Sequence, residues 1–490
     1  MTRTSMPLLT LWRVVVEARS PLSIGTGRGD GVRDVVLAAD ANGLPMLPAS
    51  ALAGVLRAAV AGWHGEAAAR ALFGCAEGDR GQVSRVTLSH GRIHDSRDRP
   101  VAGLLPQVDD PLLRPLTQRS GTTRQRVRID HRGVAADQGL FDRTVLPAGH
   151  RFSVELALWS GDGDVDPASG EPREAGWLQT LLCVEGLRVG AQTRSGLGEI
   201  AAVRAHRLAL DLRRPADLGR WARLSPHLGE TDGMAPLAVG GVPATRAGVH
   251  RIEVELAPEA GFRFGSGHHS LQAKPPAKLP DDLPRTEARV AWTGGRGRLQ
   301  RADEETVLVP ASSVKGALAH RVAFHAHRLN GRWADAESAR EHDKSRDCDT
   351  VRRLFGHAAD RGPARGQAGV LWVADARIER EHVVAQTRMH NSIDRFTGGV
   401  RDGLLFSEEN LHAAGAGPLL KLALGLDRER AARVGVTATD LQALALALDD
   451  LCAGRLALGA DSASGLGFFV GRWTCDGERR LPQPDMATAD

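Results

Sequence analysis

Aromatic side chains are scarce in this chain of 490 residues, which contains no tyrosine and only 4% aromatic residues. A platform of aromatic rings that stacks unpaired bases is therefore not expected, although such platforms are common in sheet-based RNA-recognition modules. Lysine is almost as rare, with five lysines against 58 arginines. The positive charge of the chain is thus carried by guanidinium groups.

Cysteine is sparse as well, and the five cysteines are isolated from one another, without a C-x-x-C pair. This spacing predicts neither a disulfide framework nor a thiolate zinc site. His342, Cys348 and His357 lie near one another in sequence and leave a mixed zinc site as an alternative to a plain polar insertion.

Long apolar runs are also missing, and none approaches the roughly 18–20 residues needed to cross a bilayer. The N-terminus lacks the pattern of a signal peptide. We therefore expect a cytoplasmic protein without a membrane partner. A chain of this length is too long for one compact core, so two or three domains are expected.

The arginine excess leaves a net charge of only +4, because acidic residues nearly balance it. Arginine binds phosphates bidentately and stacks on bases, which suits an RNA partner. Coding bias in a GC-rich genome is the alternative explanation. The distribution of the arginines must therefore carry the argument.

A Gly-rich stretch at 187–198 returns at 456–467, and each copy is an apolar run, a polar loop and Ser-Gly-Leu-Gly. Glycine lets backbone N–H groups approach closely, because no Cβ intervenes. Other landmarks recur in the same order. Pro48-Ala-Ser-Ala-Leu matches Pro310-Ala-Ser-Ser-Val, Leu72-Phe-Gly matches Leu354-Phe-Gly, and Ile129-Asp matches Ile393-Asp. The offsets of 262 to 282 residues indicate a tandem duplication.

Each copy reads as strand, helix, strand, insertion, strand, helix and strand, with Ser50 as a candidate cap of the first helix. This order predicts an α+β fold made of two ferredoxin-like (RRM-like) domains. We expect the first domain at 1–214 and the second at 248–478. A Gly- and Pro-rich linker is expected at 215–247, and a disordered tail at 479–490.

These landmarks resemble the RAMP superfamily of CRISPR-associated proteins, above all the Csm/Cmr-like backbone subunit of type III effector complexes. Pro310-Ala-Ser-Ser-Val-Lys-Gly316 is similar to the family's Pro-Gly-Ser-Ser-Leu-Lys-Gly motif, whereas the first copy has Ala53 in place of the lysine. The resemblance covers nearly the whole chain twice. It implies two fused backbone units that bind a guide RNA (crRNA), its complementary target RNA and other effector subunits, with a thumb hairpin in each unit.

The resemblance further implies that an aspartate before the first helix cleaves the target RNA with a divalent metal, Mg²⁺ or Mn²⁺. Asp34 is the matching residue and the expected metal ligand, and Asp30 in the same loop is the second candidate. A cation beside the scissile phosphate would offset its developing charge. In the second copy the position 262 residues later is Arg296, and the acids of that loop are Asp281, Asp282 and Glu287, of which Asp282 is favoured.

The expected RNA-binding residues are mostly arginines of the two insertions. The first insertion holds eight arginines between 114 and 151, and Arg124, Arg126 and Arg128 alternate on one strand face. In the second, Met389 and Phe396 are either base wedges or core residues. The full set is Arg124, Arg126, Arg128, Arg132, Arg188, Arg194, Lys315, Arg388, Arg395, Arg296 and Arg298.

Three other functions stay open at this point. The chain can be an RNA-binding scaffold without catalysis, or an endoribonuclease that processes precursor crRNA with a histidine as general base. The candidate bases are His90, His94, His131 and His150. A nucleotide-binding enzyme is the most distant alternative, because neither Gly-rich stretch has the P-loop spacing.

Overall fold

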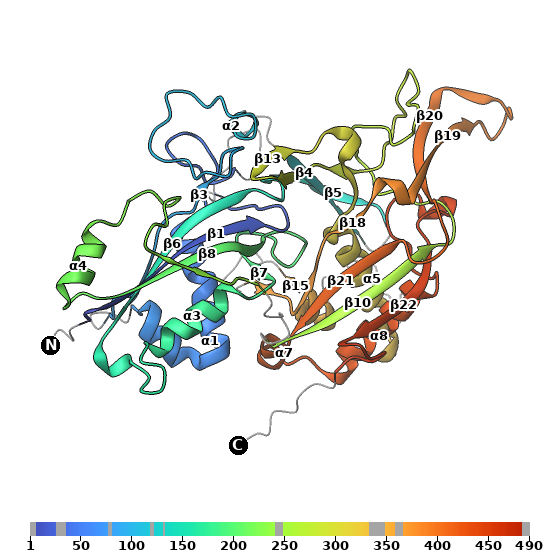
Figure 1. Ribbon diagram of the computed structural model, residues 1–490. Coiled ribbons are helices and arrows are strands. Elements are labelled where there is room, and N and C mark those ends of the chain that lie inside the picture. The colour runs from blue at the N-terminus through green and yellow to red at the C-terminus, as the bar shows by residue number, and fades with distance from the viewer. Residues whose placement is uncertain are drawn as a thin grey trace.

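The computed structural model places two α/β halves side by side, the first half in blue and green and the second in yellow to red (Figure 1). The structure describes residues 6–25, 36–76, 81–117, 122–130, 133–240, 248–332, 348–357 and 366–482.

The first half is built on an antiparallel sheet with the strand order β2-β6-β1-β8-β7, to which β3 and β9 add at β6 and β8. Its strands are β1 (Leu8–Ala18), β2 (Val86–Leu88), β3 (Arg92–Ile93), β6 (Arg151–Ser160), β7 (Leu187–Arg188), β8 (Glu199–Asp211) and β9 (Ala235–Leu237). Its helices are α1 (Ala49–Phe73), α2 (Arg114–Thr117), α3 (Arg173–Leu182) and α4 (Pro215–Ala222). The helices α1 and α3 lie below the sheet in Figure 1.

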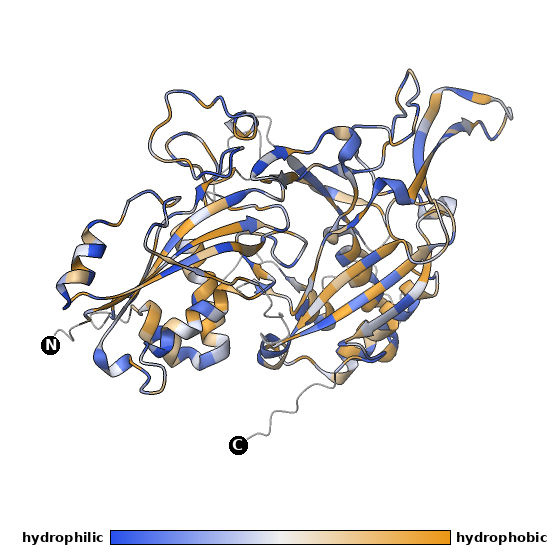
Figure 2. Cartoon of the chain, in the orientation of Figure 1, coloured by the Kyte–Doolittle hydropathy of each residue, from blue (hydrophilic) through white to orange (hydrophobic). Residues whose placement is uncertain are grey.

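Successive side chains of β1 point to opposite faces of the sheet, and those on one face form the core of this half. Trp12, Val14 and Val16 point into a cluster with the apolar faces of α1 and α3, and Figure 2 shows hydrophobic residues gathered along these strands and helices. The helix α1 starts after Pro48 without a side-chain cap, so the expected cap at Ser50 is wrong. A non-helical Gly65 (φ 85°) breaks α1 into two segments.

The opposite face of the first sheet is covered by residues 212–237, a segment expected to be part of a linker. Leu9 and Leu11 pack there against Leu208, Leu210 and Met234. The buried Arg13 donates hydrogen bonds to the carbonyls of Ser225 (2.5 Å) and His227 (3.0 Å). With α4 and β9, this segment is a packed layer of the first half, because an apolar sheet face and a buried guanidinium both need a cover.

The second half repeats the connectivity in a sheet of order β17-β21-β10-β22, all antiparallel. Its strands are β10 (Val249–Pro258), β17 (Leu371–Val373), β21 (Leu420–Asp427) and β22 (Phe469–Cys475). Its helices are α5 (Ala311–Leu329), α6 (Asp349–Phe355), α7 (Arg428–Val434) and α8 (Ala438–Cys452). The helix α5 follows β10 as α1 follows β1, and α8 precedes β22 as α3 precedes β8.

Smaller sheets complete the second half. They comprise β11 (Thr286–Glu287), β14 (Thr306–Val309), β18 (Ala376–Ile378), β12 (Val290–Thr293), β13 (Arg296–Leu299), β15 (Gly356–His357) and β16 (Gln367–Ala368). The β12–β13 hairpin reaches the first half, where Val290 N donates to Ala148 O at 2.8 Å and Gly297 N donates to Ser96 O at 2.9 Å.

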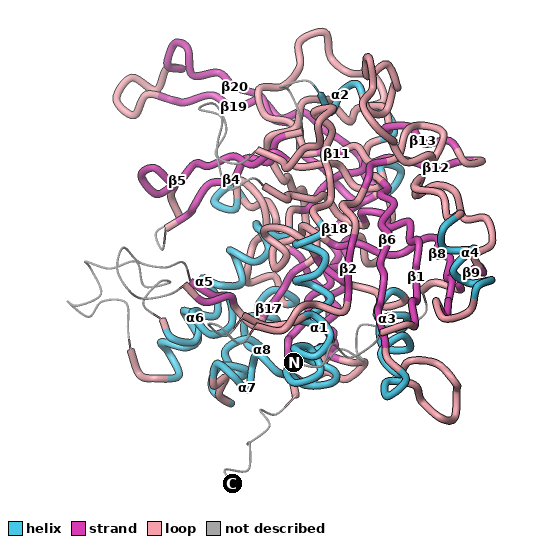
Figure 3. Tube along the Cα trace, turned by 90° about the vertical axis from the view of Figure 1, so that its left-hand side faces the viewer, coloured by secondary structure: helices cyan, strands magenta, loops and turns pink. Residues whose placement is uncertain are grey.

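Each half also carries one long hairpin in the expected insertion. The first consists of β4 (Thr123–Ile129) and β5 (Ala135–Thr144), and the second of β19 (Val383–Ile393) and β20 (Val400–Ala413). Both hairpins extend from the same side of the molecule (Figure 3).

The two Gly-rich loops share one backbone design. Val189 N donates to Gly198 O and Leu458 N to Gly467 O, both at 2.8 Å. Gln192 and Asp461 occupy the same place in their loops, with positive φ values of 58° and 59°. This match in the hydrogen bonds confirms that the second loop repeats the first.

Candidate nucleic-acid interface

The first Gly-rich loop sits against the second half, where β17 ends and α5 begins. Ser195 forms a parallel bridge with Val373, and Val373 N donates to Arg194 O at 3.4 Å. A Cβ on Gly196 (φ +91°) would come within 2.2 Å of Asp375 Oδ1 and 2.8 Å of Ala311 Cβ. Glycine is therefore required where the halves meet, a region we call the junction.

Arg124 on β4 forms the central ion pairs of the junction, and its side chain is 3% exposed. Its guanidinium donates to Glu287 at 2.8 and 2.6 Å and to Asp375 at 2.7 Å. Burial alone would lower the pKa of Arg124, but the two carboxylates outweigh burial and raise it. The charge of Arg124, an expected RNA contact, is thus neutralised inside the protein by Glu287 and Asp375.

Arg188 and Arg194 are also engaged within the protein. Arg188 pairs with Glu199 at 2.7 Å and lies over the Trp372 ring at 4.5 Å. Arg194 pairs with Asp427 at 3.0 Å and donates to Val370 O at 3.1 Å. Both expected contacts of the Gly-rich stretch thus hold the two halves together.

Next to these pairs lies a group of cations without a carboxylate partner in the described part of the chain: Arg126, Arg285 and Lys315, here called the junction cluster. Arg126 donates only to Gln192 Oε1 (2.8 Å) and Ser195 O (3.4 Å). Burial, followed by the charge of Arg124, lowers the pKa of Arg126 to about 10. Burial, followed by the charges of Arg194 and Arg126, lowers the pKa of Lys315 to about 8.

These shifts have one physical meaning. Positive groups crowded into a partly dry site repel one another, and a bound anion would relieve that repulsion. The nearby acids cannot supply the anion, because Glu287 and Asp375 are already saturated by Arg124 and Arg377. The junction cluster is therefore suited to a phosphate.

The hairpins extend the basic surface outward. Arg128, Arg388 and Arg395 are exposed. Met389 and Phe396 are 64% and 95% exposed, so neither is a core residue. On β13, Arg296 is exposed and Arg298 pairs with Glu304 at 2.7 Å.

The three candidate catalytic aspartates have different outcomes. Asp34 and Asp30 lie outside the described residues, as does Arg132. Asp282 is exposed and lies 3.6 Å from the Arg263 guanidinium, which also pairs with Glu408 at 3.0 Å and with Asp461. A guanidinium thus occupies the centre of these carboxylates, where a divalent cation would have to sit.

Comparison with known proteins identifies the architecture. The model of the RAMP superfamily matches residues 15–201 and again residues 291–470, which together are most of the chain. The chain belongs to the RAMP superfamily. The two matches confirm the tandem organisation, one RAMP region in each half.

Among solved structures, the chain is similar to one from the apo state of a type III-B Cmr-beta complex. The identity is 14%, the match covers 39% of this chain and 97% of that one, and the TM-score is 0.29. A second is from a Cmr-beta complex bound to cognate target RNA, with 15% identity, 41% and 61% coverage and a TM-score of 0.28. No curated protein sequence matches the chain.

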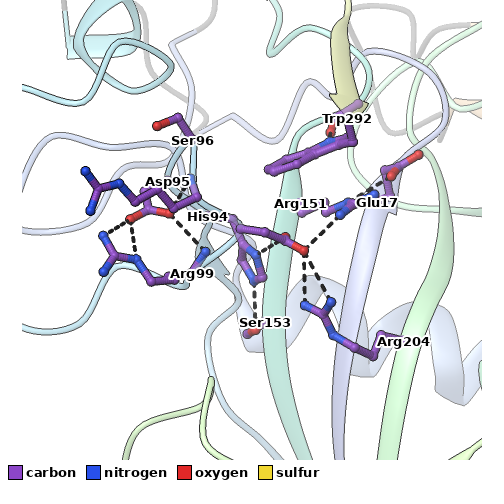
Figure 4. A network of polar contacts seen from close by, with 12 residues as sticks. Glu17, His94, Asp95, Ser96, Arg99, Arg151, Ser153, Arg204 and Trp292 are labelled. Carbon is purple, nitrogen blue, oxygen red and sulfur yellow. Dashed lines mark hydrogen bonds and ion pairs between the residues drawn. The ribbon is translucent and has the colours of Figure 1, made fainter. Parts of the chain in front are cut away.

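Two of the candidate histidines of the first RAMP half, His94 and His150, are poor general bases. His94 is buried between Asp98 (Nδ1–Oδ1 2.8 Å) and Ser153 (Nε2–Oγ 2.8 Å), in the network of Figure 4. This Ser–His–Asp arrangement is closed to solvent, because His94 is 1% and Ser153 2% exposed. Burial lowers the pKa of His150 to about 3.

The same network ties the RAMP halves together. Arg151 pairs with Asp98 at 3.0 Å and with Glu17 at 2.9 Å, and lies over the Trp292 ring of the second half at 4.2 Å (Figure 4). Burial opposes ionisation of Asp98, but the His94 hydrogen bond and the charges of Arg151 and Arg204 outweigh it and lower its pKa. The role of His94 here is structural.

His131 lies outside the described residues, and the exposed His90 accepts a hydrogen bond from Ala49 N at 3.1 Å. For the zinc site considered as an alternative, His342 is outside the described part, Cys348 is buried and His357 is exposed. Within the described ranges, no helix is long and apolar enough to cross a membrane.

Proposed function

We propose that this RAMP protein is a crRNA-binding backbone subunit of a type III CRISPR effector complex, which also contacts the complementary target RNA. The observation that carries the proposal is the junction cluster, where Arg126, Arg285 and Lys315 crowd together while the nearby acids are already paired with Arg124 and Arg377. The shared order β2-β6-β1-β8 and β17-β21-β10-β22 supports a pair of ferredoxin-like domains.

A strand of RNA fits this surface better than a small anion does. The cluster continues into two hairpins that extend from one side and expose Arg128, Arg388 and Arg395. Phosphates repeat along a nucleic-acid backbone, so spaced cations can each neutralise one. The exposed Met389 and Phe396 add apolar surface at the second hairpin that can pack against bases. We infer that both hairpins act as thumbs.

The direct experiment is to purify the tagged chain from its native host and sequence the RNA that accompanies it. Short RNAs of uniform repeat-plus-spacer form are expected. The double variant Arg126→Ala/Lys315→Ala should lose most of this RNA. Lys421→Ala is the matched control, since Lys421 is an exposed lysine on β21 whose nearest acid is Glu255 at 3.8 Å. A random cellular RNA mixture, or equal RNA in both variants, would refute the proposal.

Target cleavage is a second proposal that stands apart from guide binding. Asp34 would hold Mg²⁺ or Mn²⁺ at the scissile phosphate, and the metal would supply charge neutralisation. In the assembled complex, Asp34→Ala should abolish cleavage and leave the bound crRNA unchanged. Asp30→Ala and Asp282→Ala should retain most of the activity, the latter because Asp282 faces Arg263. Full cutting by Asp34→Ala would remove Asp34 from the mechanism, and no cutting by the wild-type complex would leave the chain a scaffold.

A further inference from the structure

Three side chains of different chemistry meet at the end of the second sheet: His250 on β10, Cys475 at the end of β22 and Asp476 directly after it. Their ligand atoms, one from each residue, all lie within 4.8 Å of one another. No other group of three or more His, Cys, Asp or Glu ligand atoms lies this close together in the searched, described part of the chain.

The backbone holds this group in place. Ile252 pairs with Cys475 across the sheet, and Asp476 N donates to Arg251 O at 2.8 Å. The Asp476 carboxylate accepts from Arg251 N at 2.8 Å and lies 2.7 Å from His250 Nδ1. Asp476 adopts a left-handed conformation (φ 49°), which turns the chain so that its carboxylate faces the strand it has just left. Residues 225 apart in sequence are thereby fixed side by side.

The cysteine gives a second, independent indication of a ligand. Cys475 is 4% exposed, and its thiol has no hydrogen-bond partner in the described part of the chain. This buried thiol lies beside a carboxylate and an imidazole, which border a cleft of about 520 Å³.

We propose that His250, Cys475 and Asp476 bind a zinc ion, with a fourth coordination position open to the cleft. Nitrogen, sulfur and carboxylate oxygen are the donors that zinc takes in proteins, whereas Mg²⁺ and Ca²⁺ prefer oxygen alone. Zinc bonds of about 2.0–2.3 Å place tetrahedral ligands roughly 3.3–3.8 Å apart, so small side-chain movements would close the site. Binding would transfer the thiol proton to solvent and leave a thiolate on the metal.

The described part of the first half has no such set. At the 269-residue offset that relates the Gly-rich loops, the positions of Cys475 and Asp476 are held by His206 and Arg207. The zinc ion would thus belong to the second half alone and connect the start of β10 to the end of β22. It also differs from the alternative site considered near Cys348, because its ligands are distant in sequence.

The test is a Co²⁺ titration of the tag-free full chain after dialysis against a chelator, followed by displacement with Zn²⁺. We expect one equivalent of Co²⁺ with a thiolate-to-cobalt charge-transfer band, and an increase in Tm on adding Zn²⁺. Cys475→Ser should abolish the band, and His250→Ala, at a partly buried position outside the hydrophobic core, should weaken binding at least tenfold.

Two matched controls distinguish this site from other thiols. Cys452→Ser replaces another buried cysteine of the same half, and Cys348→Ser removes the thiol of the alternative site. Both should keep the band. Absence of a thiolate band in the wild-type chain, its persistence in Cys475→Ser, or its loss only in Cys348→Ser would overturn the proposal.

Discussion

The same hairpin position has opposite environments in the two halves. Arg124 and Arg388 occupy equivalent positions in their hairpins. The residue opposite Arg124 is Arg143, and the residue opposite Arg388 is Glu408. Each of these partners lies three residues before a leucine that bridges to the loop after the first strand of its half, Leu146 or Leu411. Arg124 is 2% exposed and saturated by two acids. Arg388 is exposed and has no ion pair in the described part of the chain.

The Gly-rich loops repeat this contrast. Gly196 presses on Asp375, whereas a Cβ on the equivalent Gly465 would meet nothing within 4 Å. One copy of each element is buried against the second half of the same chain, and the other copy is open. An arginine in a duplicated motif can therefore stabilise an internal interface in one copy and be available to a ligand in the other.

Removing the buried Arg124 cation should have the largest effect on the free energy of unfolding. Arg124→Ala leaves the carboxylates of Glu287 and Asp375 buried without their main partner, which should cost about 3–5 kcal/mol of the free energy of unfolding. Chemical denaturation of the purified chain measures this. Loss of less than about 1 kcal/mol would show that the junction does not depend on this ion pair.

Substitution of the equivalent glycines Gly196 and Gly465 should give the second-largest effect on the free energy of unfolding. Gly196→Ala and Gly465→Ala both force alanine into a left-handed conformation, at about 1–2 kcal/mol each. Gly196→Ala should cost about 1–3 kcal/mol more, because Asp375 is fixed by Arg124 and by Ala311 N and cannot move away. Equal unfolding free energies for the two variants would contradict the contact at the junction.

Lys315 should make RNA binding depend on pH. Its pKa of about 8 means that the free protein loses this charge as the pH rises through 8, so RNA affinity should fall between pH 7 and pH 9. Lys315→Met should bind RNA roughly tenfold more weakly at pH 7, and Lys315→Arg should bind with little pH dependence. Fluorescence anisotropy with a labelled RNA measures both. A wild-type profile as flat as that of Lys315→Arg would exclude Lys315 from the interface.

The lowered pKa of Lys315 also determines how the stability of the folded chain changes with pH. Between pH 8 and the ordinary lysine value of 10.5, the unfolded chain binds more protons at this group than the folded chain does. Lys315 therefore contributes a gain in stability as the pH rises through this window.

The smallest effect on stability is expected at the open position. Arg388→Ala should change the free energy of unfolding by less than about 0.5 kcal/mol, in contrast to Arg124→Ala. It should instead reduce the slope of log affinity against log salt by about 0.7, the value for one phosphate contact on a single strand. Destabilisation by Arg388→Ala comparable to that of Arg124→Ala would remove the contrast between the halves.

The sequence predicted the repeated elements well, because their signals are local. The strand and helix that open each copy of the predicted order are present as β1 with α1 and β10 with α5, and the repeated Gly-rich stretches have the same hydrogen bonds. Composition was misleading at residues 215–240, where Gly and Pro suggested a linker but Leu9, Leu11 and Arg13 require a covering layer.

Side-chain roles were less predictable, since they depend on residues far away in the chain. The partners of Arg124 are 163 and 251 residues distant, and a strand with alternating arginines looks the same whether it faces acids or RNA. The absence of acids around Lys315 and the meeting of His250 with Cys475 are likewise properties of the folded chain only.

All the acids that neutralise the first half's junction arginines come later in the chain. Arg194 is made 233 residues before its partner Asp427. At ribosomal rates of about 5–20 residues per second, the interval is roughly 10–50 seconds. During each round of synthesis, the completed first half therefore exposes Arg124 and Arg194 as free cations until the second half emerges and folds against them.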